Sequence, residues 1–193
     1  MKMPAIDCLV IPESVPTAAA RSELARLGMS PVDTLKGDGQ RLSDEEVWTN
    51  TERSLAANLV EDPLVACRYI AVRGDKRETL IQELTHALGL ITPAQSLVDA
   101  ALTKSGSEQI RALYHVVVLF PAFNDEAFAL LCKIATEHAD DFVREATVDA
   151  MAYRAWPEFA SVLTNIATSD RASSVRARAE QVLAFVLQRA AKL

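Results

Sequence analysis

The sequence is poor in cysteine and has no long hydrophobic run. Its three cysteines, Cys8, Cys67 and Cys132, are widely spaced and form no C-x-x-C pair, which argues against a disulfide framework and a zinc site. Reduced thiols are typical of the cytoplasm, so we predict a cytoplasmic protein. No segment approaches the ~20 apolar residues of a membrane span, and the first apolar run is too short for a signal-peptide core.

Aromatic residues are also scarce. Only 6% of the 193 residues are aromatic although 50% are hydrophobic, and alanine and leucine dominate the apolar set. Small and aliphatic side chains are typical of packed helices, so the composition predicts an all-α fold. At this length we expect one sizeable domain, or a repeat array with an N-terminal elaboration.

The sequence lacks a recognisable catalytic constellation. His86, His115 and His138 are scattered and stand in no metal-binding spacing. We therefore predict a protein that is not an enzyme and that holds no cofactor or metal. His138 does lie in an acidic turn, where carboxylates and an imidazole suit a divalent cation. Helix capping by Asp140 or Asp141 is the favoured interpretation, because a cap needs one residue and a metal site needs several.

What the sequence does contain is a repeat. Three times, a threonine is followed seven residues later by an aliphatic–arginine pair. The threonines are Thr103, Thr136 and Thr168, and the arginines are Arg111, Arg144 and Arg176, with spacings of 33 and 32 residues. A period in this range, carried by helix-compatible residues, is typical of stacked helical repeats.

The middle copy shows which face of its first helix is buried. Val143, Ala146, Thr147, Ala150 and Met151 fall on one helical stripe, with small residues where a neighbouring helix approaches closely. This pattern resembles the HEAT family, in particular the short HEAT-like repeats also found in phycobilin lyases. The resemblance covers roughly residues 76–193. It implies an α-solenoid of antiparallel helix pairs and a structural role for the repeated arginines, and it transfers no catalytic residue.

The first sixty residues break the period, because prolines and glycines divide them into short pieces. We predict an irregular N-terminal cap over residues 1–62 and HEAT-like repeats over 63–193, forming one continuous unit. Residues 64–73 fit either a helix or a strand. The expected pieces are an extended Ile6 to Ile11, a helix near Thr17 to Leu27, a loop from Gly28 to Arg41, and a helix from Ser43 with Glu46 in a capping box. In the repeat region, Lys76 to Leu88 and Pro93 to Thr103 are expected to form the first and second helices of an earlier copy.

Charge provides the main indication of function. The formal net charge is −6, and Asn124 to Asp170 holds nine acids against three bases. Asp141, Glu145 and Asp149 are spaced i, i+4, i+8, so they line one helix face, at a cost of about 0.2–0.5 kcal/mol per pair. This stripe is either a solvated face that keeps the protein soluble or a docking surface for a basic partner, and the pattern favours neither.

The sequence therefore predicts a non-enzymatic protein-binding module with a basic protein partner. A narrower hypothesis is a bacterial immunity protein that neutralises a cationic toxin. The alternatives are a HEAT-like nucleic-acid enzyme of the DNA glycosylase type, which the acidic balance opposes, and a lyase-type cofactor-handling protein. The expected partner-binding residues are Glu137, Asp140, Asp141, Glu145, Asp149, Tyr153 and Trp156. The last two sit at a predicted helix end beside Pro157, where packing is favoured over an exposed aromatic anchor.

Overall fold

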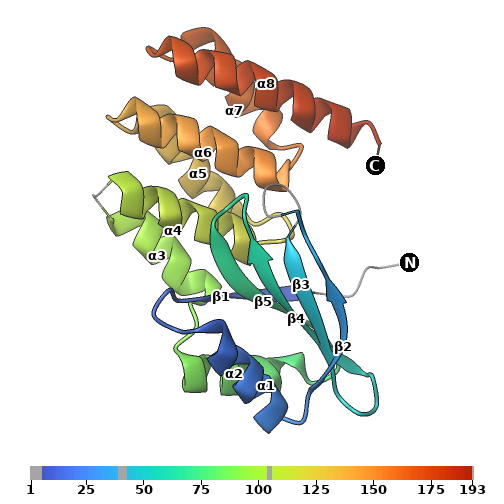
Figure 1. Cartoon of the computed structure of the whole chain (residues 1–193). Coiled ribbons are helices and arrows are strands. Elements are labelled where there is room, and N and C mark those ends of the chain that lie inside the picture. The colour runs from blue at the N-terminus through green and yellow to red at the C-terminus, as the bar shows by residue number, and fades with distance from the viewer. Residues whose placement is uncertain (1–5, 39–42, 104–105, 193) are drawn as a thin grey trace. The chain divides into compact units, whose positions relative to one another are not determined.

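A computed structural model describes residues 6–38, 43–103 and 106–192 (Figure 1). The chain forms two compact units, residues 1–95 and 96–193, which we call the N-terminal unit and the helical unit. The predicted boundary after residue 62 falls inside the N-terminal unit, between two strands that pair with each other. None of the helices in the described ranges combines the length and hydropathy needed to cross a membrane.

The N-terminal unit is built on a five-stranded antiparallel sheet, so the all-α prediction is wrong. The strand order is β1-β5-β4-β3-β2. The strands are β1 (Ile6–Ile11), β2 (Ser30–Leu35), β3 (Asp44–Thr49), β4 (Leu55–Asp62) and β5 (Cys67–Gly74), and the helices of this unit are α1 (Thr17–Arg26) and α2 (Arg77–Leu88).

One face of this sheet holds the core of the N-terminal unit. Alternate strand residues such as Leu9, Leu59 and Ile70 are buried there, as expected for strands with one face packed. Leu24 of α1 and Leu84 of α2 belong to the same cluster. Helix α2 was expected to be the first helix of a repeat, and that assignment is wrong because its apolar stripe packs on the sheet.

The predicted helix from Ser43 is also wrong, since this segment forms β3, a turn and β4. The capping-box pattern is a local signal, whereas pairing of Trp48 with Ala57 and of Glu46 with Leu59 joins residues distant in sequence. In the turn, the Asn50 side chain accepts hydrogen bonds from the backbone N–H groups of Ser54 and Leu55 at 3.0 and 3.1 Å. Tertiary pairing therefore overrides the local helix propensity.

Two other N-terminal expectations are settled by the strands. The segment predicted as a loop, Gly28 to Arg41, contains β2, although residues 39–41 lie outside the described ranges. The open choice for residues 64–73 resolves to strand β5 from Cys67 onward.

At the end of β5, Gly74 has a φ of +110°, and a Cβ there would collide with the Ser54 carbonyl oxygen, so only glycine fits. The extended Ile6 to Ile11 and the helix from Thr17 are confirmed.

The helical unit consists of stacked antiparallel helices (Figure 1). Helices α4, α6 and α8 contact one another in succession, α5 contacts α7, and α5 and α7 each pack on the helix that follows them. The helices are α3 (Pro93–Leu102), at the start of the unit, α4 (Gly106–Leu119), α5 (Asp125–Glu137), α6 (Asp141–Arg154), α7 (Phe159–Ser169) and α8 (Ser173–Ala190). Of the buried face predicted for α6, Val143, Thr147, Ala150 and Met151 are each 0% exposed, whereas Ala146 is only half-buried.

Candidate binding surface

Arg144 joins two consecutive turns of the helical unit. Its side chain is 1% exposed, and its Nε and Nη2 atoms each donate to the Asp170 carboxylate at 2.8 Å. Its Nη1 atom donates to the carbonyl oxygen of His138 at 2.8 Å. The hydrogen bond from Arg144 lowers the pKa of Asp170 below its usual range, and the same contact raises the pKa of Arg144. The predicted structural role of this arginine is confirmed.

Two further arginines bind backbone carbonyl groups at the same turns. Arg176 donates from Nη1 to the carbonyl oxygen of Asp170 at 2.6 Å, the contact that Arg144 makes with His138 one repeat earlier. Arg171 donates from Nη2 to the carbonyl oxygens of His138 and Ala139. These guanidinium groups supply donors to carbonyls just beyond the ends of α5 and α7, where the helices leave acceptors unsatisfied.

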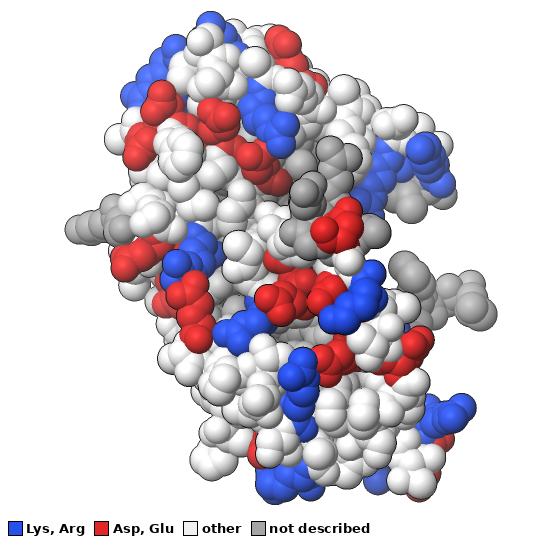
Figure 2. Space-filling view, in the orientation of Figure 1, with Lys and Arg blue, Asp and Glu red and all other residues white. Residues whose placement is uncertain are grey.

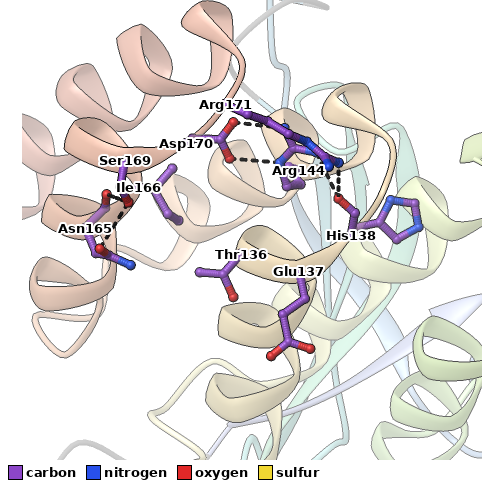
Figure 3. A pocket seen from close by; sticks show the side chains of 9 residues that line it. All are labelled: Thr136, Glu137, His138, Arg144, Asn165, Ile166, Ser169, Asp170 and Arg171. Carbon is purple, nitrogen blue, oxygen red and sulfur yellow. Dashed lines mark hydrogen bonds and ion pairs between the residues drawn. The ribbon is translucent and has the colours of Figure 1, made fainter.

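A polar groove of about 240 Å³ lies between these two turns (Figure 3). Its lining residues come from the ends of α5 and α7 and from the turns that follow: Thr136, Glu137, His138, Arg144, Asn165, Ile166, Ser169, Asp170 and Arg171. The Arg144 and Asp170 side chains are bonded to each other, and the Asn165 Oδ1 accepts from Ser169. The polar groups of the groove therefore mainly stabilise the turns.

The His138 side chain is hydrogen-bonded within the turn between α5 and α6. Its Nδ1 atom lies 3.1 Å from the backbone nitrogen of Asp140 and accepts that N–H. The Asp140 carboxylate in turn accepts the backbone N–H of Phe142 at 2.9 Å and caps α6. Across the described ranges no group of three or more histidine, cysteine, aspartate or glutamate side chains is arranged to hold a metal ion. The capping interpretation of Asp140 is confirmed.

The three carboxylates of the predicted stripe have different surroundings. Asp141 is exposed, whereas Glu145 and Asp149 are half-buried on the same side of α6. Asp149 forms an ion pair with Arg178 of α8, with side-chain exposures of 34% and 40%. Arg178 of α8 occupies the repeat position that Ala146 occupies in α6. Ala146 itself lies one helical turn before Asp149. An arginine in place of an alanine at this repeat position was the sequence signal for the ion pair. The charge of Asp149 is therefore already partly neutralised by Arg178.

The two aromatic residues proposed as anchors are packed inside the helical unit. Trp156 is 6% exposed, and its ring stacks on Phe159 at 5.2 Å and meets Phe123 edge-on at 5.4 Å between centroids. Tyr153 is half-buried beneath the guanidinium of Arg154, 5.0 Å from its ring centroid. Trp156 is therefore a core residue in this structure, and the favoured packing interpretation is confirmed for it.

Four of the acids predicted to bind a partner lie around the turn between α5 and α6. We call Glu137, Asp140, Asp141 and Glu145 the acidic turn. Within the described residues, Glu137, Asp141 and Glu145 make no ion pair. Figure 2 shows acidic side chains over α6 and its N-terminal end, with basic side chains of α8 beside them. Arg144, Arg171 and Arg178 bind internal partners, so none of them forms an ion pair with the acidic turn, although Asp140 and Asp141 do interact electrostatically with Arg144.

Comparison with protein-family models, curated proteins and solved structures finds no match for this chain. The HEAT-like resemblance accordingly stays a prediction. Function has to be argued from the surface itself.

The Arg144–Asp170 contact predicts how stability depends on pH. A carboxyl group whose pKa is lowered on folding stabilises the protein fully above its unfolded pKa of about 4, and the stabilisation is lost as pH falls through the folded value. Thermal unfolding of the native protein and of Asp170→Asn should therefore differ most near neutral pH. Their difference should shrink steadily below about pH 4. A difference that is constant across this range would contradict the assignment.

Proposed function

We propose that the helical unit is a protein-binding module that docks a basic partner on the acidic turn. The observation that carries the proposal is a set of three carboxylates, of which Glu137 and Asp141 are exposed and Glu145 is half-buried, and none of which forms an ion pair within the described residues. Asp141 and Glu145 are like charges one turn apart on α6, and their repulsion opposes the favourable interaction of Asp141 with the N-terminus of that helix. A basic partner surface would compensate these charges and accelerate encounter.

The test compares two charge reversals of equal size. The site variant carries Glu137→Lys, Asp141→Lys and Glu145→Lys, and the control carries Glu126→Lys, Glu158→Lys and Glu180→Lys at exposed positions elsewhere in the same unit. Tagged native protein should capture a basic protein from lysate of its source cells at low salt. The site variant should lose that protein and the control should retain it, with capture weakening as salt is added.

Two results would contradict the proposal. Retention of the same partner by the site variant would exclude the acidic turn as the docking surface. Equal loss from both variants would show that net charge alone drives the association. Circular dichroism of each variant tests whether the helices persist. We expect that they do, because surface substitutions usually change stability by less than about 0.5 kcal/mol each.

The narrower form of the proposal is an immunity protein in the cytoplasm. The acidic surface supports it, because cationic toxins such as nucleases carry complementary charge, and the three free cysteines support a reducing compartment. Expression of the captured partner alone should arrest cell growth, and co-expression with the native chain should restore it. Growth that the partner does not affect would reject the immunity role while leaving protein binding intact.

A further inference from the structure

The acidic turn contains one residue whose placement neither the core nor the repeat requires. Phe142, in the first turn of α6, is 70% exposed and is the most exposed aromatic side chain among the described residues. Its neighbour Val143 points into the core and is 0% exposed. In the next copy Ser174 occupies the position of Phe142, and it is also exposed, so the fold accepts a polar side chain here.

Three carboxylates lie close to Phe142 along the chain. Asp140 accepts its backbone N–H, Asp141 precedes it, and Glu145 lies one helical turn further on. Exposing a large apolar ring to water is energetically unfavourable. Because the ring of Phe142 is exposed, it is accessible to a ligand. Carboxylates and an aromatic face attract the same kind of group, namely a cation with an extended flat surface.

We propose that Phe142 and the carboxylates beside it form a subsite for an arginine side chain of the partner. The inference rests on the proposed function and specifies the chemistry of its partner. The guanidinium stacks on the ring of Phe142 while its N–H groups reach Asp141 and Glu145. An arginine-rich segment fits this site better than a lysine-rich one of equal charge, because the planar guanidinium stacks on aromatic rings and pairs with carboxylates through several donors.

Defined peptides test the proposal on the full chain. Fluorescently labelled nona-arginine and nona-lysine carry equal charge, and their binding is measured by anisotropy at low ionic strength. Native protein should prefer nona-arginine by about two- to five-fold, the size expected of one exposed cation–π contact. Phe142→Ala should remove this preference and leave nona-lysine binding unchanged. Amide chemical-shift changes on adding nona-arginine should centre on residues 138–146.

Matched variants distinguish the ring from general hydrophobicity. Phe142→Leu keeps an apolar side chain without a π-face and should behave as Phe142→Ala, whereas Phe185→Ala removes an exposed ring of α8 and should behave as native protein. Full arginine preference in Phe142→Leu, or equal loss in Phe185→Ala, would overturn the proposal. The combined Glu137→Gln, Asp141→Asn and Glu145→Gln variant should bind both peptides more weakly. If it does not, the proposed function fails, independently of the result at Phe142.

Discussion

Replacing Ala150 by aspartate should unfold the helical unit. Ala150 is 0% exposed in the middle of α6, which packs on α4, α5 and α8, so the new carboxylate would lie in the interior without a partner. The desolvation penalty for such a group is several kcal/mol, and we expect a loss of about 4 kcal/mol or more. A domain is typically stable by about 5–15 kcal/mol, so most of that margin would disappear.

Urea unfolding followed by circular dichroism measures this loss. Ala184→Asp is the matched control, because Ala184 is an exposed alanine within α8, where aspartate costs only about 0.7 kcal/mol of helix propensity. A similar midpoint for the two variants would mean that the interior face of α6 has been assigned incorrectly.

Replacing Asp170 by leucine should cost about 3–5 kcal/mol, because it leaves the guanidinium of Arg144 buried without its counter-charge. The pair is nearly inaccessible, with side-chain exposures of 1% and 5%, and is held by two hydrogen bonds of 2.8 Å. Adding Arg144→Met to Asp170→Leu should recover much of the loss, since an apolar pair replaces a lone buried charge. Chemical unfolding of both single variants and the double variant gives the coupling energy.

The half-buried ion pair between Asp149 and Arg178 provides the comparison. Arg178→Met should cost no more than about 1 kcal/mol, because ion pairs that water can reach gain little. If both pairs showed the same coupling, burial would not be the reason for the strength of the Arg144–Asp170 contact.

Part of the fold was predictable because its signals are local. The stripe from Val143 to Met151 has a helical period, and the structure buries it as expected. The strands from Asp44 to Asp62 were missed because their helix-like start is a short-range pattern. The pairing that determines them connects β3 to β4 and β4 to β5 across turns that sequence reasoning did not identify.

For the candidate surface, the role of the repeated arginines could be predicted from the sequence, but the ion pairs could not. The recurrence of Arg144 and Arg176 indicated a structural role, and both bind carbonyl oxygens of their own turns. That Asp170 receives Arg144, and that Arg178 partly neutralises Asp149, depends on which helix lies beside which. The sequence did not indicate that Phe142 is exposed, because an apolar residue next to an inward valine has no pattern that separates a surface position from a core one.

The sequence by itself determined the helical unit's period, its inward face and its excess of acids from α5 to α7, because these follow from the order of residues along the chain and require no knowledge of which elements pack together. The tertiary structure decided that the first half is a sheet covered by two helices, and it decided which charges remain free. The physical reason is the same in both cases. Strand pairing joins Ile6 of β1 to Arg73 of β5, and the ion pairs join Arg144 to Asp170 and Asp149 to Arg178, and no local preference specifies such partners.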